Sequence, residues 1–244
     1  MHCTTPGSVL ITHSHFSHSN IPVGVLYDLR CAQNTVGPWR IVVRFRDFPS
    51  DSVIRCSTRE TAEKMYMHTL KQALYVLQGN TRSFNAMVLE QQQLLWEGAN
   101  SGSRGIFESV ADDLRGLEAV KCIPIRILYK RRRAAASHRE DTLVEETVKV
   151  NDSPNLDNYH PSFLCIQKPM YVYLNDGKVQ ETQLSDALEQ FIPGLLSDGP
   201  SRLPRCISVM IQGIEVPLTA PLWQLWKLCA HADFFLYIIV SDTS

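Results

Sequence analysis

The sequence predicts an α+β protein, with a helix-rich section between two sections that contain strands. Two observations support this prediction. Apolar residues recur at helical spacing between about residues 57 and 118, and short apolar runs typical of strands lie before and after that stretch. The chain of 244 residues therefore divides into three parts, 1–56, 57–118 and 119–244, and is long enough to bury a hydrophobic core.

The first section, residues 1–56, contains few predicted elements. Pro22 can begin a short helix in the run PVGVLYDLRCA. The run GPWRIVVRFRDFP alternates apolar and basic side chains, which predicts a strand that stops at Pro49, and the apolar run SVLITHS predicts one more. A small sheet needs about three strands to be stable alone, so we expect this domain to be incomplete.

Three helices are predicted in the middle section. Ser57 and Glu60 match the S-x-x-E capping box, so Ser57 is the expected N-cap of a helix that ends at Gly79. A second helix contains Phe84 and is expected to end at Gly98. The run RGIFESVADDLRGL is the third, with one apolar stripe. Together they predict a small bundle or helical layer.

The last section returns to strands. Its predicted order is a strand in AVKCIPIRILYK, a strand and Asn-Asp-Gly turn in KPMYVYLNDGK, a helix in TQLSDALEQFIP, a strand in CISVMIQGIEV, a short helix in LWQLWKLCAH and a strand in DFFLYIIVS. A hairpin, a helix across it and further strands form the ubiquitin-like β-grasp arrangement. The polar segment at about 131–161 is expected to be a solvated insertion.

Composition limits the function classes. The formal net charge of −1 argues against a nucleic-acid binder that works through bulk positive charge. No apolar run approaches the roughly 20 residues that span a bilayer. The N-terminal residues do not resemble a signal peptide, and the seven cysteines are scattered, which predicts reduced thiols in the cytoplasm.

The most enzyme-like residues are three histidines near the N-terminus. His13, His15 and His18 follow an apolar run, as in the H-x-H-x-D-H motif of metallo-β-lactamase-type hydrolases. Ser17 stands where that motif needs its aspartate. A small metal-dependent hydrolase therefore remains an alternative. No P-loop, G-x-G-x-x-G or G-x-S-x-G motif is present, so we expect no catalysis by this chain and no cofactor.

Lys71 stands near the end of the first predicted helix of the middle section. On a helical projection the residues Ala62, Met65, Tyr66, Thr69, Ala73, Val76 and Leu77 share one direction. Lys71 and Lys64 lie on the opposite side, so both amines are predicted to be exposed. Such an amine suits a modification site and suits a solvated lysine equally well.

Several stretches resemble one known family. IPVGVLYDL, PWRIVVRFRDFP, MHTLKQALYVLQGN, CIPIRILY, VMIQGIE followed by PLWQLW, and DFFLYIIV occur in the order found in the autophagy protein 5 family, most closely its plant-type members. The resemblance covers about residues 20–242 apart from the polar insertion. It implies two ubiquitin-like β-grasp domains, the first incomplete here, on either side of a helix-rich domain.

The resemblance also implies a non-enzymatic function in autophagy. By position, Lys71 is the family's acceptor for autophagy protein 12, a ubiquitin-like protein joined to the lysine through an isopeptide bond. The conjugate binds autophagy protein 16 and works with an E2-like enzyme loaded with autophagy protein 8, promoting its E3-like transfer to lipid. Expected locations are the cytoplasm and, peripherally, the membrane of the phagophore, the preautophagosomal structure.

Two details complete these expectations. Gly24 and Asp28 match the segment near which the family contacts autophagy protein 16. Residues 1–19 do not resemble the family's N-terminus, which suggests a truncated or atypical start. A further alternative is a ubiquitin-like interaction protein that binds partners without a covalent role.

Overall fold

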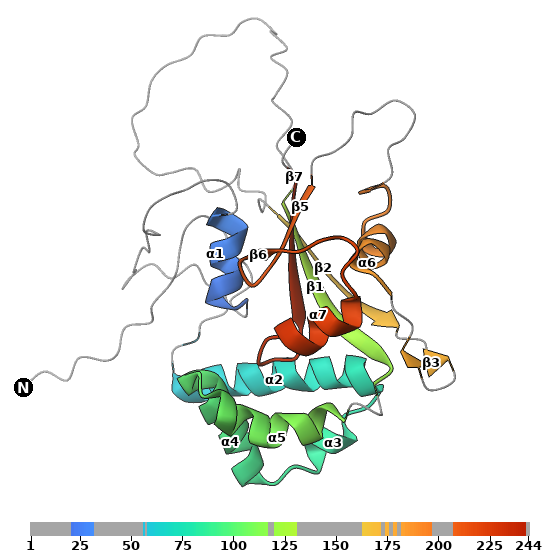
Figure 1. Ribbon diagram of the computed structural model, residues 1–244. Helices are drawn as coiled ribbons and strands as arrows, with labels where there is room; N and C mark the ends of the chain where they lie inside the picture. Colours follow the sequence, from blue (N-terminus) through green and yellow to red (C-terminus); the bar gives the residue numbers. More distant parts are fainter. Residues whose placement is uncertain are drawn as a thin grey trace, which may run out of the picture.

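A helix bundle packs against one end of a mixed sheet, and a separate helix lies beside that sheet (Figure 1). This computed structural model describes residues 21–31, 56, 58–116, 120–130, 163–171, 174–175, 178–179, 182–196 and 207–242. The predicted α+β class is confirmed. Of the first predicted section, the described part is chiefly helix α1, Val23–Cys31.

The helical section contains one long helix and three shorter ones. Their bounds are Arg59–Gln78 for α2, Arg82–Asn85 for α3, Leu89–Ser101 for α4 and Arg104–Arg115 for α5. The predicted N-cap Ser57 is wrong by one residue. Thr58 has the extended backbone of an N-cap, and its hydroxyl oxygen accepts a hydrogen bond from the Thr61 backbone N–H at 3.2 Å.

The second predicted helix is in fact two, and Gly98 does not end it. Helix α4 continues to Ser101, and Gly102 ends it with a left-handed φ of 70°. Gly98 is there because α5 passes too close for a side chain. A Cβ at Gly98 would lie 2.6 Å from the backbone nitrogen of Phe107. A glycine inside a helical pattern can therefore mark a helix crossing instead of a stop.

The C-terminal section is a five-stranded sheet in the order β2-β1-β7-β5-β6. Its strands are β1 Cys122–Lys130, β2 Leu164–Tyr171, β5 Ile207–Ile211, β6 Ile214–Glu215 and β7 Leu236–Asp242. Strand β1 pairs antiparallel with β2 and parallel with β7, while β5 pairs antiparallel with β7 and with β6. This is the predicted β-grasp topology.

Two helices and a small hairpin accompany the sheet. Helix α6, Leu184–Phe191, and helix α7, Leu222–Cys229, contact β2 and β7 respectively. Strands β3, Leu174–Asn175, and β4, Lys178–Val179, pair so that Asn175 is opposite Lys178, which agrees with the position of the predicted turn.

One predicted strand is a hairpin. The run CISVMIQGIEV was expected to be a single strand, but β5 ends at Ile211 and β6 begins at Ile214. Gln212 and Gly213 both have positive φ, 50° and 76°. Two such residues give the tight turn that matches the twist of paired strands.

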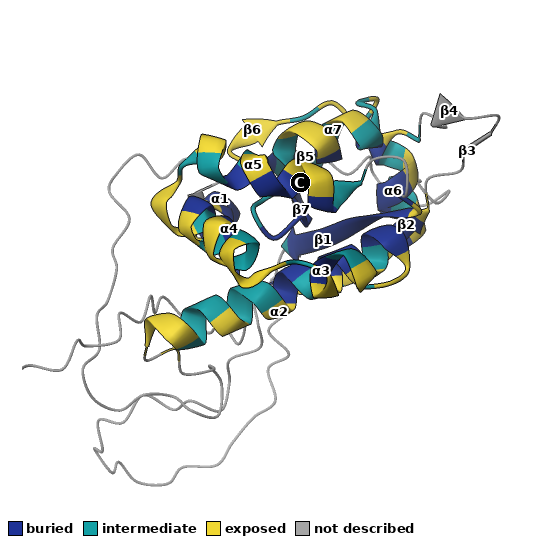
Figure 2. Ribbon diagram, turned by 90° about the horizontal axis from the view of Figure 1, so that it is seen from below, coloured by how far each residue is buried: buried dark blue, intermediate teal, exposed yellow. Residues whose placement is uncertain are grey.

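The core runs along the two central strands. Both faces of β1 and β7 are buried, whereas the outer faces of the helices are exposed (Figure 2). The far end of α2 reaches this core, because the Lys121 backbone N–H donates to the Leu77 carbonyl at 2.7 Å just before β1 begins. The helical bundle and the sheet are therefore directly joined.

Strand β2 is an edge of the sheet as described, and it pairs with β1 in a register that sets Pro169 opposite Pro124. In an antiparallel pair, opposite residues either exchange two N–H···O bonds or exchange none. Two prolines have no N–H, so this pair is a non-bonded one. The nitrogen of Pro169 therefore faces outward from the sheet.

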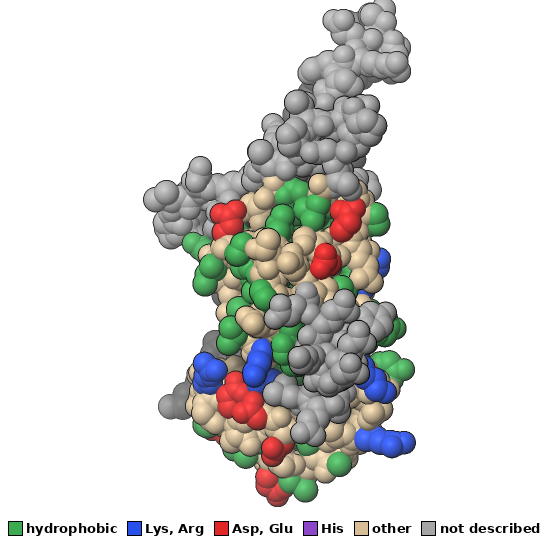
Figure 3. All heavy atoms as spheres, turned by 45° about the vertical axis from the view of Figure 1, so that its right-hand side comes forward, with side chains coloured by type: hydrophobic (Ala, Val, Ile, Leu, Met, Phe, Trp, Pro, Cys, Tyr) green, Lys and Arg blue, Asp and Glu red, His purple; other side chains and the backbone are tan. Residues whose placement is uncertain are grey.

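Acidic and basic side chains lie interspersed over the described surface in Figure 3, which is in keeping with the formal net charge of −1. Among the described residues, no helix is long and apolar enough to cross a membrane. The predicted strands of the first section, the histidines His13, His15 and His18, and the polar insertion at about 131–161 lie outside the described residues.

Candidate functional site

Helix α2 carries the candidate acceptor Lys71. It is the longest of the described helices, at 20 residues, and its buried stripe includes Leu70, Leu74 and Leu77. Gly79 ends the helix with a φ of 75°, and its backbone N–H donates to the Tyr75 carbonyl at 2.8 Å. The position of Lys71 is thus fixed by a helix that is capped at both ends and buried along one side of its C-terminal half.

Lys71 was predicted to be exposed, but the structure shows it only partly exposed. The helical projection omitted Leu70 and Leu74, which are two of the four residues of α2 with no exposed area. With the buried face centred on them, Lys71 lies at its margin. Lys64 is exposed, as predicted.

The Lys71 amine lies over an aromatic ring. Its Nζ is 5.6 Å from the centroid of Phe84, which belongs to the short helix α3. This distance is within the range in which the face of a ring attracts a cation. From the sequence, Phe84 was expected only to lie in the second helix of the middle section, because nothing local to it shows that the chain folds back beside Lys71.

Phe84 is held by a hydrogen-bonded clamp. The Ser83 hydroxyl donates to Gln78 Oε1 at 2.7 Å, and Gln78 Nε2 donates to the Leu114 carbonyl at 2.8 Å and, more weakly, to that of Arg115 at 3.4 Å. The clamp joins α2, the start of α3 and the end of α5. Gln78 is buried, and its amide satisfies backbone carbonyls at the end of α5 that would otherwise lack donors.

Gly24 and Asp28 do not form one site. Gly24 is exposed on α1, and no other part of the described chain approaches within 4 Å of where its Cβ would be. Asp28 is buried and points to the turn between β5 and β6, where the Gly213 backbone N–H hydrogen-bonds to its carboxylate. Burial raises the pKa of Asp28, while the Gly213 N–H and His231 oppose this shift. Asp28 is thus an internal contact that joins α1 to the β-grasp domain.

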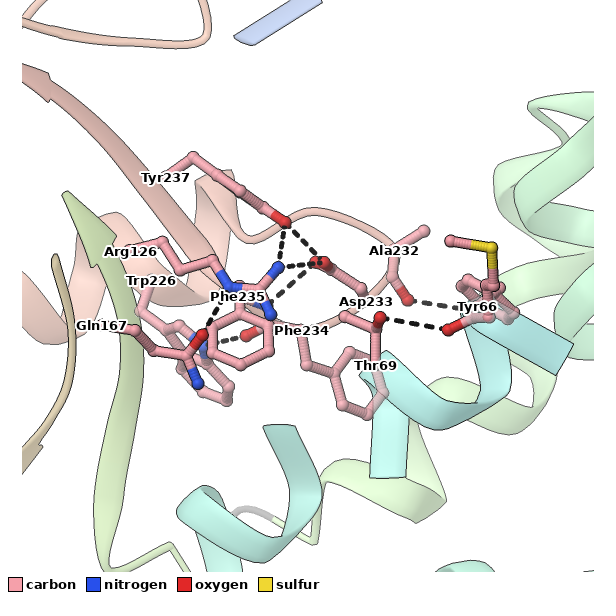
Figure 4. Close-up of polar contacts among 11 residues, drawn as sticks. Tyr66, Thr69, Arg126, Gln167, Trp226, Ala232, Asp233, Phe234, Phe235 and Tyr237 are labelled. Atoms are coloured by element: carbon pink, nitrogen blue, oxygen red, sulfur yellow. Dashed lines mark hydrogen bonds and ion pairs between the residues drawn. The ribbon is translucent and has the colours of Figure 1, made fainter. Parts of the chain in front are cut away.

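The loop from α7 to β7, residues 230–235, connects all three parts. The Tyr66 hydroxyl of α2 donates to the Ala232 carbonyl at 3.1 Å (Figure 4). Phe234 packs edge-on against Phe107 of α5, with ring centroids 6.2 Å apart. Asp28 of α1 lies close enough to the loop for its charge to oppose the lowering of the pKa of His231 by burial. We call residues 230–235 the junction loop.

A buried charge pair anchors the junction loop to the sheet. Tyr237 donates to Asp233 Oδ2 at 2.7 Å and accepts from Arg126 Nη1 at 2.6 Å, while Arg126 and Asp233 lie 3.6 Å apart (Figure 4). The Arg126 guanidinium is 3.8 Å from the centre of the Phe235 ring and donates to Gln167 of β2 at 2.9 Å. These hydrogen bonds satisfy a buried carboxylate and a buried arginine together.

His231 is the least satisfied member of this region. Its Nε2 is buried, with no hydrogen-bond partner among the described residues. Burial lowers the pKa of His231, and the carboxylates of Asp233 and Asp28 act in the opposite direction. Its ring meets the Tyr237 ring edge-on at 5.0 Å. Sequence reasoning missed this histidine because its neighbours come from distant segments.

The described residues bring no group of three or more histidine, cysteine or acidic side chains close enough together to hold a metal ion. The hydrolase alternative depends on His13, His15 and His18, which lie outside those residues. Cys56, Cys122, Cys165 and Cys229 are free thiols. Burial raises the pKa of Cys122, Cys165 and Cys229, which suits small core side chains better than nucleophiles.

A helical bundle joined to a β-grasp domain defines a protein built on the ubiquitin-like fold. Residues 59–116 match the description "Autophagy protein ATG5, alpha-helical bundle region", and residues 122–240 match "Autophagy protein ATG5, UblB domain". The two matches cover more than two thirds of the chain. The chain belongs to the autophagy protein 5 family, which indicates autophagy as the process in which it acts.

Individual relatives agree with this assignment. The chain is 23% identical over 262 residues to autophagy protein 5 of Arabidopsis thaliana, which covers 90% of this chain and 75% of the relative. It is 27% identical over 212 residues to that of Oryza sativa subsp. indica, which covers 75% of this chain but only 52% of the relative. The chain thus spans about half the length of the rice protein.

A solved structure supports the fold. The crystal structure of Kluyveromyces marxianus Atg5 aligns with 89% of this chain and 66% of its own, with a TM-score of 0.62 and 22% sequence identity. Similarity at this level concerns the fold, and it extends over the bundle and the β-grasp domain together.

Proposed function

We propose that this chain is a non-catalytic scaffold of autophagy, joined covalently through Lys71 to the ubiquitin-like autophagy protein 12. The observation that carries the proposal is the placement of Lys71. Its partly exposed amine lies at the margin of a rigid helix, in the segment that matches the family's helical bundle. An acceptor needs only access and orientation, and it needs no catalytic group of its own.

The proposed reaction is an aminolysis. The neutral amine of Lys71 attacks the carbonyl carbon of a thioester that links the C-terminal glycine of the ubiquitin-like protein to a cysteine of another enzyme. A C–N bond forms, the C–S bond breaks, and the proton lost from nitrogen ends on the departing thiol. The product is an isopeptide bond and a free cysteine.

The conjugate is further proposed to bind autophagy protein 16 and an E2-like enzyme loaded with autophagy protein 8, and so to promote its E3-like transfer to lipid at the phagophore membrane. Exposed residues on α1 support a partner surface there: Gly24, Val23 at 53% exposure and Tyr27 at 43%. Asp28 supports that surface indirectly, by fixing α1 against the β-grasp domain.

The test is a conjugation reaction reconstituted with the purified chain, with Lys71→Arg compared to the wild type. Arginine keeps the charge, but its guanidinium stays protonated and is a poor nucleophile. We expect the covalent adduct to disappear while the melting temperature changes little.

Lys64→Arg is the matched control, since Lys64 stands on the same helix and is exposed. It should be conjugated as efficiently as the wild type. A gel shift that persists in Lys71→Arg, or a branched peptide that maps to Lys64 by mass spectrometry, would overturn the assignment of Lys71.

A further inference from the structure

The ring beside Lys71 is built into the fold. Phe84 is 9% exposed, so its ring is part of the core surface, yet Lys71 Nζ lies 5.6 Å from its centroid. Lys64 is exposed two turns earlier on the same helix. Two lysines on one helix thus differ in their surroundings, one beside a fixed aromatic ring and one in solvent.

The ring has little freedom to move away. Gly79 turns the chain out of α2, and Asn80 continues the turn, with its Oδ1 accepting from the Arg82 backbone N–H at 3.0 Å. The short helix α3 begins two residues before Phe84, and the hydrogen bond from Ser83 to Gln78 ties its first turn to the end of α2. A helix of four residues is not stable alone, so these contacts and the burial of Phe84 hold it in place.

We propose that Phe84 is a positioning residue for conjugation: its ring confines the flexible side chain of Lys71, so that the amine is presented in one direction and is selected over Lys64. The inference rests on the proposed function of Lys71. Lysine has a long, flexible stem, and a restricted stem places its nitrogen at an incoming thioester more often. The ring attracts the ammonium form, and the neutral amine leaves the ring face when it reacts.

The first measurement concerns the contact itself. In the full-length chain, protons that lie over an aromatic ring experience its ring current. The ε-methylene protons of Lys71 should therefore resonate upfield of those of Lys64 in an NMR spectrum, and Lys71→Arg assigns the signal. Equal shifts for the two lysines would overturn the inference without any reaction being run.

The second measurement is kinetic. Phe84→Leu keeps an apolar side chain of similar size but removes the ring, and Phe84→Tyr keeps the ring. In single-turnover conjugation with a ubiquitin-like protein supplied as its C-terminal thioester, we expect Phe84→Leu to slow adduct formation about two- to fivefold, because the unconfined lysine side chain places its nitrogen at the thioester less often. When the acceptor concentration is raised to saturation, Phe84→Leu should show a lower kcat than the wild type and the same KM. Phe84→Tyr should keep the wild-type rate.

The outcomes separate this inference from the proposed function. Conjugation that survives in Lys71→Arg refutes the proposed function. Loss of conjugation in Lys71→Arg together with a wild-type kcat in Phe84→Leu leaves the proposed function standing and overturns the role of Phe84. A rise in the fraction of adduct at Lys64 in Phe84→Leu, measured by mass spectrometry, supports selection by the ring.

Discussion

At the scale of single residues, protonation of the buried His231 side chain is expected to lower the stability of the fold. It is neutral and buried in the folded chain, with Nε2 unpaired among the described residues. Protonation would place a charge between Asp28, Asp233 and the Tyr237 ring, where two carboxylates offset only part of the desolvation cost.

Because of His231, the stability of the fold is expected to decrease as the pH falls. Because the folded pKa of His231 is depressed, the unfolded chain binds a proton first as the pH falls below about 6.5. The free energy of unfolding is therefore largest above about pH 6.5, and it decreases as the pH falls from there toward the lower pKa of the folded state. Urea unfolding at pH 7.5 and 5.5 should show a larger loss of stability for the wild type than for His231→Gln.

The nearby carboxylate gives an opposite contribution at lower pH. The raised folded pKa of Asp28 means that the folded chain takes up its proton first, which adds stability between the raised folded value and about 3.9. Comparison of His231→Gln with and without Asp28→Asn separates the two groups. An equal pH dependence in wild type and His231→Gln would show that His231 does not control the junction.

At the scale of elements, the crossing of α4 and α5 depends on one missing side chain. A methyl group at Gly98 would lie 2.6 Å from the Phe107 nitrogen and 2.8 Å from its Cα, and backbone atoms cannot rotate away. Gly98→Ala should therefore push the helices apart and destabilise the chain by about 1–3 kcal/mol, measured by urea unfolding.

Gly105→Ala is the matched control for this substitution. Gly105 lies within α5, with no atom within 4 Å of a Cβ. There alanine should stabilise the helix by about 0.5–1 kcal/mol, because it loses less backbone freedom on folding. A stabilised Gly98→Ala chain would mean that α4 and α5 do not cross as described.

The elements that the sequence predicts well are those with a local signal. Helices α2, α5 and α6 follow apolar stripes with glycine or proline near their ends. The turn at Gln212 was missed because glutamine rarely takes a positive φ, so the pair Gln-Gly is a weak turn signal. Register and crossing points depend on distant partners, and for that reason Gly98 was misread.

The candidate site shows the same division. Lys71 was proposed as a site residue from its position in the stretch MHTLKQALYVLQGN. Its burial depends on which side of α2 faces the rest of the fold. That orientation is set by β1 and by the neighbouring helices, which the helical projection does not contain. Phe84, Arg126 and Asp233 acquire their contacts only through the tertiary structure, so no pattern around them could reveal their roles.

At the scale of the whole molecule, the junction loop contacts both the bundle and the β-grasp domain. Phe234 has a strained positive φ of 67°, and its ring lies between the domains against Phe107 and the Arg115 guanidinium. The Arg126–Asp233 pair holds this loop on the sheet. We expect the two parts to unfold together.

Asp233→Ala tests this coupling. It leaves the buried Arg126 without its carboxylate, which should destabilise the chain by about 3–5 kcal/mol. Hydrogen exchange should rise in α4 of the bundle as well as in β7. A loss of protection confined to β7 would show that the two parts are independent.

Replacement of both charges, Arg126→Met with Asp233→Leu, is the control. Apolar residues of similar size leave no unpaired charge, so the double variant should recover most of the stability. If the double variant is no more stable than Asp233→Ala, the loss comes from the loop's shape and not from the orphaned arginine.

The paired prolines of β1 and β2 have a consequence for how this molecule behaves in a crowded solution. Pro169 turns its nitrogen toward the side of β2 on which the described residues place no further strand, so that side lacks a donor where an added strand would need one. A strand of a second chain that paired with β2 there would lack one backbone hydrogen bond and would clash with the proline ring. Pro169 thus disfavours edge-to-edge pairing of β2 with another chain, which would lead to self-association and fibre growth. Replacement of Pro169 with valine should therefore raise the tendency to aggregate.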